Sequence, residues 1–358
     1  MFAKIAVLGL GKVGCLAAEL LADAGFDVTG FDARTVAEAP FPTHSVEFGE
    51  AAALRRALAG REAVLSCLPF AFNSAIASTA HGLGLHYFDL TEDVGTTRHI
   101  RALARTAKGI MAPQCGLAPG FVGIVGANLA EQFERVRSIR LRVGALPQHP
   151  SGLLGYAFNW SPEGVVNEYL NDCEVIEDGV LKTVSAMEWL ETIYVGGVRL
   201  EAFTTSGGLG TMCETFAGRV ENLDYKSLRY PGHASLMNFF FHELLMREDR
   251  AAAGKILTNA KPPVDDDVVY VHAAAEGWKD GLLGRREFVR AYHPLEIMGR
   301  ARTAIAWTTA ASVCAVIEMA RSGGLPGKGF LKQETIPFDG FLKTRTGRLY
   351  AEHGRIQR

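Results

Sequence analysis

The sequence predicts an α/β protein: a doubly wound parallel sheet, followed by an α+β second domain with a largely antiparallel sheet. Three observations predict this fold class. Short apolar runs alternate with amphipathic helical runs from residue 1 to about 125, a pattern typical of parallel strands covered by helices. A glycine-rich turn directly follows the first apolar run. Beyond residue 126, period-two strands and hairpin signals replace this alternation.

The first region, residues 1–125, alternates strands and helices in chain order. The predicted strands are KIAVLGL, FDVTGFDA, EAVLSCLPF, HYFDLTE and IMAPQCG. The predicted helices between them are KVGCLAAELLADAG, EAAALRRALAG, NSAIASTAHGLG and TTRHIRALARTAKG. Because each strand is short and apolar, we expect all of them in one buried parallel sheet.

The second region, residues 126–295, contains hairpin-like strands. SIRLRVGAL alternates in the manner of a half-exposed strand, and Asp178-Gly179 and Lys279-Asp280-Gly281 mark hairpin turns. We expect helices near 213–222 and 234–250, and one long helix over 296–322. Residues 296–358 are expected to return to the first domain, with a cleft between the two domains.

Composition excludes several classes of partner. The 358 residues carry a formal net charge of −2 with no Lys/Arg-rich run, which argues against nucleic acid or an anionic membrane as a partner. The longest apolar run, 304–320, contains Glu318 and many small residues, which indicates a buried helix and no membrane span. The six cysteines are scattered without a C-x-x-C pair, which favours reduced thiols and a cytoplasmic protein.

The glycine-rich turn GLGKVG predicts a dinucleotide site of Rossmann type. It follows a strand and opens a helix, and Asp32 ends the next strand 18 residues beyond Gly14. In such turns the first glycine allows the sharp bend, the second lets the backbone approach a pyrophosphate, and the third lets the helix pack on the strand. The predicted cofactor-binding residues of this turn are Gly9, Gly11, Lys12, Val13 and Gly14.

Asp32 favours NAD over NADP. Its carboxylate would accept hydrogen bonds from the adenosine ribose and repel a 2′-phosphate. Arg34 keeps NADP open, because an arginine at this position pairs with that phosphate.

The carboxyl ends of two further strands border the same predicted crevice. Ser66, Cys67 and Pro69 follow one strand, and we expect them beside the nicotinamide, with an ordinary strand-to-helix loop as the alternative. Asp89 ends the next strand. A carboxylate there is either a helix cap or a substrate ligand, and we favour the substrate.

Motifs along most of the chain resemble the saccharopine dehydrogenase-like family, and within it most of all the lysine 6-dehydrogenases. The resemblance runs from residue 3 to about 340 and rests on GLGKVG, SCLPF, FDLTED, QCGLAPGF, WSPEGVVNEYL, EAFTTSGGLGT and LRYPGH. Saccharopine reductases tend to have aspartate where this chain has Ala118, which favours the lysine branch. The resemblance implies NAD-dependent oxidation of the ε-amine of L-lysine to 2-aminoadipate 6-semialdehyde, with release of ammonia. We also expect a homo-oligomer, a dimer.

The stretch SLRYPGH, 227–233, is suited to holding an amino-acid substrate. The guanidinium of Arg229 would bind the α-carboxylate bidentately. Tyr230 and His233 flank it around Pro231-Gly232. The alternative is a structural turn with an exposed arginine.

Other candidates for the substrate site come from two motifs. Trp160 and Tyr169 would form apolar walls for the methylenes, with Glu168 as an ammonium partner, although Ser161-Pro162-Glu163 also predicts an ordinary helix start. Thr205 and Ser206 in the glycine-rich TTSGGLGT would bind the amino-acid head.

Hydride transfer requires a neutral amine, so a base is needed. Asp89 and His233 are the candidates, and the sequence does not rank them. No metal site is expected: Asp265-Asp266-Asp267 is interpreted as an acidic turn before a strand. His44, His81 and His353 are expected at the surface.

Two other functions stay open at this point. A saccharopine-type dehydrogenase acting on a secondary amine would need a second carboxylate-binding group, and Arg199, Arg219 or Lys226 would supply it. A non-catalytic NAD-binding regulator that kept the fold is the other alternative.

Overall fold

The computed structural model describes residues 2–34, 36 and 39–355. The described chain divides into two compact units. Unit 1 comprises Met1–Ile124 and Ala306–Glu352, and unit 2 comprises Val125–Ile305 and His353–Arg358. The cleft expected between the two domains stays a prediction.

The described residues of unit 1 form the predicted parallel sheet. Its seven strands lie in the order β17-β6-β5-β4-β1-β2-β3, and every neighbouring pair is parallel. Their bounds are β1 Lys4–Leu8, β2 Asp27–Asp32, β3 Thr43–Ser45, β4 Ala63–Ser66, β5 His86–Asp89, β6 Ile110–Ala112 and β17 Gly329–Phe330. The short β3 and β17 were not predicted, and β17 reaches this sheet from the far end of the chain.

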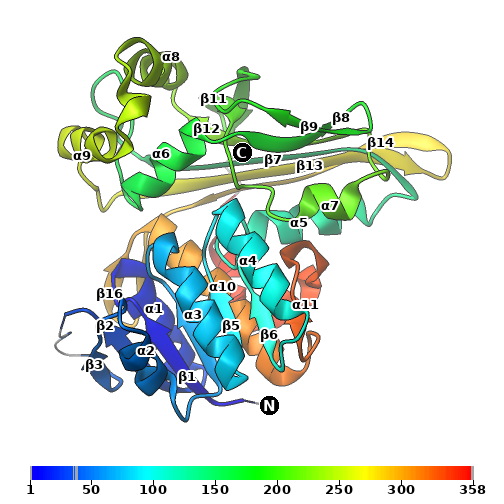
Figure 1. Ribbon diagram of the computed structural model, residues 1–358. Coiled ribbons are helices and arrows are strands. Elements are labelled where there is room, and N and C mark those ends of the chain that lie inside the picture. The colour runs from blue at the N-terminus through cyan, green and yellow to red at the C-terminus, as the bar shows by residue number, and fades with distance from the viewer. Residues whose placement is uncertain (1, 35, 37–38, 356–358) are drawn as a thin grey trace. The chain divides into compact units, whose positions relative to one another are not determined.

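Helices α1 to α4 connect the strands β1 to β6 of unit 1, and α11 and α12 follow β17. Figure 1 shows α1, α3 and α4 beside β1, β5 and β6. Their bounds are α1 Lys12–Asp23, α2 Ala51–Leu58, α3 Phe70–Leu83, α4 Val94–Ala104, α11 Phe338–Lys343 and α12 Arg348–His353. Apolar residues of the strands and helices, among them Leu8, Val64, Ile76, Tyr87 and Ile100, form one buried core. The Rossmann-type prediction is confirmed for this region.

The described residues of unit 2 form a mixed, mostly antiparallel sheet of eight strands. Six lie in the order β10-β11-β12-β7-β13-β14, while β8 pairs with β9 and β12. Their bounds are β7 Arg135–Pro147, β8 Cys173–Glu177, β9 Val180–Val184, β10 Glu191–Val195, β11 Val198–Thr204, β12 Asn222–Arg229, β13 Asp267–Lys279 and β14 Leu282–Tyr292. Only the pair of β12 with β7 is parallel among these strands.

Both predicted hairpins of unit 2 are confirmed. Asp178 and Gly179 have φ values of 52° and 78°, and Asp280 and Gly281 have 53° and 76°. Two successive residues with positive φ define the type I′ turn, whose twist matches the flanking antiparallel strands. The turns therefore fix the registers of β8 with β9 and of β13 with β14.

The predicted helices of unit 2 needed correction. The helix expected over 213–222 is only α7 Met212–Phe216, because Gly218 turns the chain with φ 71° and residues from Asn222 pair as β12 instead. The expected helix over 234–250 is α8 His233–Asn238, a π-helical turn Phe239–Glu243 and a 3-10 turn Met246–Glu248. Helices α5 Phe121–Ala130 and α9 Arg250–Ala260 were not predicted, while α6 Pro162–Leu170 begins where Ser161-Pro162-Glu163 predicted.

The long C-terminal helix is shorter than predicted: α10 spans Ala304–Ser322, not 296–322. Residues before it form the hairpin β15 Leu295–Ile297 and β16 Arg300–Arg302, which turns at Met298 and Gly299 with positive φ. Asp267, which the sequence placed in an acidic turn, is fully buried and accepts the first N–H groups of this helix, from Ala304 and Ile305. A cap from a strand distant in sequence thus sets the helix start.

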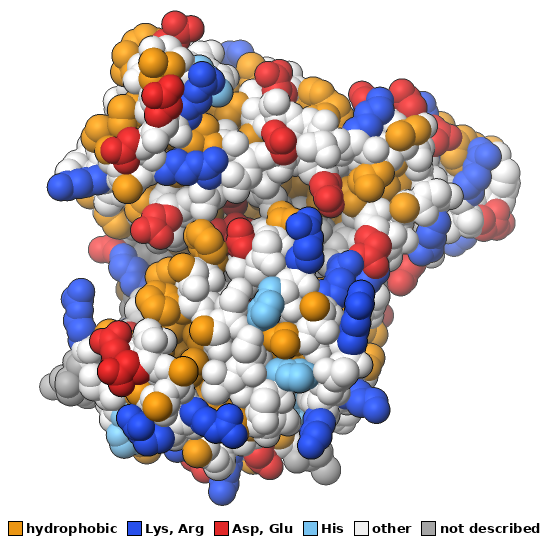
Figure 2. All heavy atoms as spheres, viewed as in Figure 1, with side chains coloured by type: hydrophobic (Ala, Val, Ile, Leu, Met, Phe, Trp, Pro, Cys, Tyr) orange, Lys and Arg blue, Asp and Glu red, His pale blue; other side chains and the backbone are white. Residues whose placement is uncertain are grey.

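The surface carries mixed charge and exposed apolar side chains. On the face in Figure 2, basic and acidic side chains are interspersed, and hydrophobic side chains gather over the segment from α8 to α9. The exposed apolar residues of that segment are Phe239, Leu244, Leu245 and Ile256. Within the described residues, no helix combines the length and apolarity needed to cross a bilayer.

Candidate functional site

The glycine turn between β1 and α1 has the geometry of a dinucleotide site. Gly9 has φ 86°, which favours glycine. A Cβ on Gly14 would lie 1.8 Å from the Gly9 carbonyl oxygen, so the helix could not approach the turn with a larger residue. A Cβ on Gly11, in contrast, would meet no protein atom within 4 Å. Protein packing therefore does not require glycine at position 11, and a close approach by a ligand would.

The N-terminus of α1 adds an anion site to this turn. Gly11 is the N-cap, and no side chain accepts a hydrogen bond there. The first N–H groups of a helix have no partner within it, and the helix dipole favours a negative charge at this end. The residues present thus fit the pyrophosphate of a dinucleotide.

Asp32, at the end of β2, is tied to the same turn. One carboxylate oxygen accepts the N–H of Leu10 at 2.7 Å, and the other accepts the N–H of Arg34 at 3.0 Å. These contacts hold the carboxylate beside the glycine turn, where a ribose would lie. Lys12 and the side chain of Arg34 are exposed, and Val13 is partly buried.

The residues after β4 lie beside the glycine turn, although one of them is bonded inward. A Cβ on Gly9 would lie 3.0 Å from the Cys67 carbonyl, so the two loops are in contact. Burial raises the pKa of Cys67 to about 12, which keeps the thiol neutral. Ser66 is buried and bonds Asn73 of α3 at 2.7 Å, while Pro69 is exposed at the start of α3.

Asp89, at the end of β5, is enclosed by the protein. Its side chain is fully buried and accepts the Tyr87 hydroxyl at 2.7 Å and the N–H groups of Thr91 and Gln114 at 3.0 Å each. Burial raises the pKa of Asp89 to about 6, against these three hydrogen bonds. The Asp89 carboxylate thus holds the loops that follow β5 and β6 together. In this arrangement it positions these two loops.

The loop after β6 is tightly folded, a feature that sequence analysis missed. Gln114 has φ 67°, and its N–H is held by Asp89. A Cβ on Gly120 would lie 2.1 Å from the Gly116 carbonyl oxygen. Burial raises the pKa of Cys115 well above its ordinary value, and this thiol accepts the side-chain amide of Gln333 at 3.3 Å.

In unit 2, three polar side chains form a buried chain of hydrogen bonds. Nε of Arg229 donates to the Tyr169 hydroxyl at 2.6 Å, and that hydroxyl lies 2.9 Å from Nε2 of His233. Nδ1 of His233 lies 3.0 Å from the Leu154 carbonyl oxygen. The exposed fractions of Arg229, Tyr169 and His233 are 3%, 2% and 1%.

These contacts determine the protonation of His233. A carbonyl only accepts, so Nδ1 carries the hydrogen and donates to Leu154. Nε2 then accepts from the Tyr169 hydroxyl, whose oxygen accepts from Arg229. Burial, and after it the positive charge of Arg229, lowers the pKa of His233 to about 3. His233 is therefore neutral, and both ring nitrogens are in use.

Aromatic rings surround the Arg229 guanidinium. Its carbon lies 4.7 Å from the ring centre of Tyr156 and 5.5 Å from that of Tyr169, distances typical of cation–π contacts. Trp160 bonds the Tyr156 hydroxyl at 3.3 Å. Glu168, buried on α6, interacts electrostatically with Arg229. The structure thus brings together four residues that the sequence analysis proposed for the substrate site: Arg229, His233, Trp160 and Glu168. Tyr156, which was not proposed, contacts both Arg229 and Trp160.

Glu201, missed by sequence analysis, fixes the turn that follows Arg229. It lies opposite Arg229 in the pairing of β11 with β12. Its carboxylate accepts the N–H of Gly232 at 2.9 Å and that of Ala234 at 2.6 Å. The motifs EAFTT and LRYPGH contain Glu201 and Arg229, but the motifs do not show that these two residues lie opposite each other. That pairing is set by the sheet, so it is a tertiary feature.

The other predicted substrate residues bond to the protein itself. The Tyr230 hydroxyl donates to the Pro147 carbonyl at 2.9 Å, away from the Arg229 chain. Thr205 bonds Ser227 at 2.8 Å, and Ser206 donates to the Asp172 carbonyl at 2.9 Å. In the same loop the close backbone approach is made by Gly208 to the Tyr225 ring, where a Cβ would lie at 2.2 Å.

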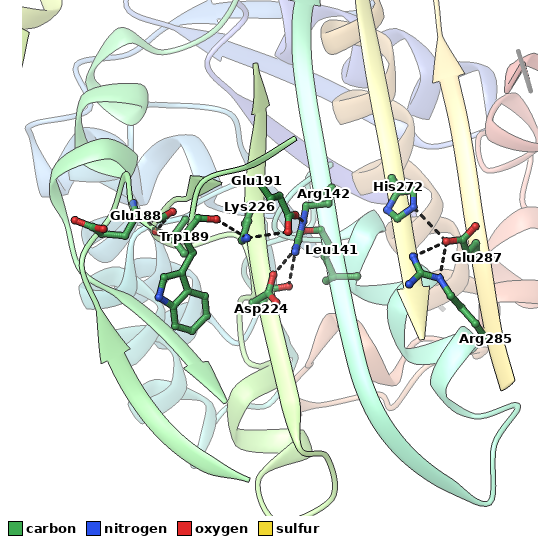
Figure 3. Close-up of polar contacts among 11 residues, drawn as sticks. Leu141, Arg142, Glu188, Trp189, Glu191, Asp224, Lys226, His272, Arg285 and Glu287 are labelled. Carbon is green, nitrogen blue, oxygen red and sulfur yellow. Dashed lines mark hydrogen bonds and ion pairs between the residues drawn. The ribbon is translucent and has the colours of Figure 1, made fainter. Parts of the chain in front are cut away.

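A network of charges lies on the other face of the unit 2 sheet (Figure 3). Arg142 pairs with Asp224 and, at 2.6 Å, with Glu191; Lys226 pairs with Glu191 at 3.1 Å. Lys226 also donates to the Trp189 carbonyl at 2.6 Å. Alternation along β12 places Lys226 and Arg229 on opposite faces. Lys226 therefore does not serve the site of Arg229, while Arg199 and Arg219 are exposed.

Within the described ranges, no group of three or more His, Cys, Asp or Glu side chains is placed to hold a metal ion. His44 is exposed, and His81 and His353 are partly buried.

A parallel sheet with a dinucleotide-type glycine turn, joined to an α+β unit with a mixed sheet, is the architecture of two-domain nicotinamide-dependent dehydrogenases. The chain belongs to the saccharopine dehydrogenase family: residues 116–349 match the model of the saccharopine dehydrogenase C-terminal domain. This confirms the family to which the sequence motifs pointed.

Curated relatives carry the same family name. Two are saccharopine dehydrogenases (NADP(+), L-glutamate-forming), from Schizosaccharomyces pombe and Saccharomyces cerevisiae, with 22% identity over 154 residues and 26% over 161 residues. Each match covers 41% of this chain and 34% of the relative. The match thus spans about a third of the length of these relatives.

Solved structures share the fold over nearly the whole chain. Apo saccharopine dehydrogenase (L-Glu forming) from Saccharomyces cerevisiae has a TM-score of 0.77 at 18% identity, covering 99% of both chains. An engineered D-amino acid dehydrogenase bound to NADP+ has a TM-score of 0.52 at 12% identity, covering 98% of this chain and 99% of its own. At such identities the likeness concerns the fold.

Proposed function

We propose that the protein is an NAD-dependent dehydrogenase that oxidises the ε-amine of L-lysine to 2-aminoadipate 6-semialdehyde and releases ammonia. The aldehyde would cyclise with its own α-amine to piperideine-6-carboxylate. The observation that carries the proposal is Arg229, a buried guanidinium surrounded by aromatic rings. It suits a substrate with one carboxylate and an apolar chain.

The case for a carboxylate at Arg229 rests on its buried charge. Nε and Nη1 donate to Tyr169 and to the Leu228 carbonyl, which are neutral acceptors. The carboxylate of Glu168 acts on the guanidinium electrostatically. Burying a cation is costly, and a bidentate substrate carboxylate would offset much of that cost.

The surroundings of Arg229 suit the rest of the substrate. Tyr156 and Trp160 offer apolar rings for four methylenes, and Glu168 offers negative charge for the α-ammonium. Tyr169 and His233 would hold Arg229 in place, because each is fixed by the next member of the hydrogen-bond chain.

The cofactor would be held by the glycine turn, the N-terminus of α1 and Asp32. Bound NAD would supply the hydride acceptor. We propose NAD over NADP because the Asp32 carboxylate is fixed beside the turn, where it would repel a 2′-phosphate. The family relatives are named for NADP, so this preference is a property of the present chain to be measured.

The test is a substrate screen with the purified protein. L-Lysine, L-saccharopine, L-ornithine and cadaverine are each supplied with NAD or NADP, and reduced cofactor is followed by absorbance. We expect L-lysine with NAD to give the highest kcat/KM, with one ammonia released per NADH. A higher kcat/KM for another amine, or NADH formation without ammonia, contradicts the proposal.

A saccharopine-type dehydrogenase is the second candidate, favoured by the family match and by the names of the curated relatives. Saccharopine carries additional carboxylates, which require a further cation near Arg229. Lys226 is excluded from that role by its position on the opposite face. In the screen, this candidate predicts turnover of L-saccharopine and no ammonia.

Assembly and cellular location also stay predictions. A dimer is expected, and light scattering of the purified protein would measure its mass. A cytoplasmic location is expected from the scattered thiols, and fractionation would test it.

A further inference from the structure

We propose that Glu92 is the general base that removes a proton from the substrate amine. The inference rests on the proposed function, because it concerns the amine that is oxidised there. Glu92 lies in the loop between β5 and α4, at the carboxyl edge of the parallel sheet. In the sheet, β5 is separated from β1 and its glycine turn only by β4, which places this loop on the side where a nicotinamide would lie.

The two bases expected from the sequence are both occupied. Asp89 is fully buried and uses both oxygens on three protein donors. His233 donates from Nδ1 to Leu154 and accepts at Nε2 from Tyr169. His233 therefore has no free lone pair for a substrate, and taking one would break a buried hydrogen bond at a cost of about 1–3 kcal/mol. Asp89 keeps one acceptor site on Oδ2, but its side chain is enclosed by the protein and has no exposed surface.

Other titratable groups at the sheet edge are also unsuited. Burial raises the pKa of Cys67 to about 12 and that of Cys115 well above its ordinary value, so both thiols are protonated. Asp93 caps α4, where it accepts the N–H of Thr96 at 2.6 Å. Glu92 is the remaining carboxyl group of the loop.

Glu92 has the properties that a base requires. Its side chain is partly buried. Across the described residues, it forms no hydrogen bond or ion pair with a side chain or with the backbone of another residue. Burial raises the pKa of Glu92 to about 7, against a hydrogen bond from its own backbone N–H, and the negative charges of Asp93 and Asp89 act in the same direction as burial. A carboxylate with this pKa both ionises and accepts a proton near neutral pH.

The proposed step balances as follows. The carboxylate accepts one proton from the –NH₃⁺ group, which leaves –NH₂ with a free electron pair. As hydride leaves the adjacent carbon, this pair forms the C=N bond of the iminium. Water then adds to that carbon, and ammonia leaves. Glu92 returns its proton to solvent.

The test compares the pH dependence of three forms of the protein. Wild-type kcat/KM should rise through about pH 7. In E92Q, kcat/KM should be about 10²–10⁴-fold lower at pH 7.5, and the rise of kcat/KM near pH 7 (the acidic limb of the pH profile) should be missing. The activity of E92Q should recover as the pH approaches the ordinary amine pKa of about 10.4. Asp93→Asn, which keeps a helix cap, should retain activity and move the limb to lower pH, because it removes a neighbouring negative charge.

Two further readouts separate catalysis from structure. Cofactor affinity of E92Q, measured by fluorescence, should equal that of the wild type. In ¹³C-Glu-labelled protein, one carboxyl signal should titrate near pH 7 and be missing in E92Q. Wild-type activity and an unchanged limb in E92Q would overturn the proposal, as would inactivity without recovery at high pH. If the wild type oxidises saccharopine and not lysine, the proposed substrate is wrong, and the same comparison on saccharopine still judges Glu92.

Discussion

The hydroxyl of Tyr169 lies 2.9 Å from Nε2 of His233 and accepts the Nε hydrogen of Arg229 at 2.6 Å. One phenol therefore joins a permanent cation to a neutral imidazole in the interior of unit 2. The direction of the hydrogen bonds follows from the Leu154 carbonyl at the far end, which only accepts. The effects of pH and of Tyr169→Phe on stability both follow from this chain of hydrogen bonds.

Stability should depend on pH through His233. Its pKa is about 3 in the fold and about 6.5 in the unfolded chain, so the unfolded state binds the proton first as pH falls. The contribution of the neutral His233 imidazole to the free energy of unfolding is complete above about pH 6.5 and is lost progressively as the pH falls toward 3. At pH 5 the loss should be about 2 kcal/mol. Urea unfolding at pH 7.5 and pH 5 should show a smaller pH effect in His233→Gln. An equal effect in both proteins would contradict a neutral buried imidazole.

Tyr169→Phe should destabilise the protein by about 1–3 kcal/mol, because it leaves Nε of Arg229 and Nε2 of His233 without partners in the interior. The matched control is Tyr194→Phe on β10, where the side chain is 66% exposed and the effect should stay within about 0.5 kcal/mol. Thermal and urea unfolding measure both. Equal stabilities of the two variants would show that the hydrogen bonds from Arg229 through Tyr169 to His233 contribute nothing to the free energy of unfolding.

Arg229→Ala should lower kcat/KM for lysine by about 10–10³-fold, the equivalent of about 1.5–4 kcal/mol for a lost charge-assisted pair. Arg229→Lys should restore only part, because an ammonium does not reproduce the planar fork. Cofactor affinity should change little in either variant.

Cadaverine, which lacks the carboxylate, provides the control for Arg229. The wild type should use it poorly, and the alanine variant should lose little further activity toward it. A folded, NAD-binding Arg229→Ala that oxidises lysine at the wild-type rate would refute the carboxylate site.

Gly11→Ala should leave stability unchanged and weaken cofactor binding. The added Cβ meets no protein atom within 4 Å, so it would occupy only the space assigned to the pyrophosphate. We expect about a tenfold loss of affinity or more, the equivalent of about 1.4 kcal/mol. Gly14→Ala is the contrasting variant: its Cβ would lie 1.8 Å from the Gly9 oxygen, so it should lower the melting temperature. Unchanged cofactor titrations in Gly11→Ala would place the pyrophosphate elsewhere.

Asp32→Ala should reduce the preference for NAD over NADP by about tenfold, the equivalent of about 1.4 kcal/mol, because it removes the charge that repels the 2′-phosphate. The ratio of kcat/KM values for the two cofactors measures this. Equal use of both cofactors by the wild type would contradict the role assigned to Asp32.

Features that depend on neighbours along the chain could be predicted from local sequence. The turn from Gly9 to Gly14 depends on positions 9 and 14, where a positive φ and close packing require glycine. The hairpins at Asp178-Gly179 and Asp280-Gly281 follow from backbone conformations that these residues favour. Ser161 and Pro162 likewise start α6 by local capping. Short-range sterics and hydrogen bonds suffice for each of these, so sequence patterns predicted them.

Which candidate side chains are available for chemistry depends on tertiary packing. Asp89 ends a strand as predicted, yet Gln114, 25 residues further on, occupies its carboxylate. His233 stands beside Arg229 in sequence, yet Tyr169, 64 residues earlier, takes its free nitrogen. A buried polar group must be paired, and its partner is supplied by whichever distant segment packs against it. That choice is made by the packing of whole elements, which a local pattern does not contain.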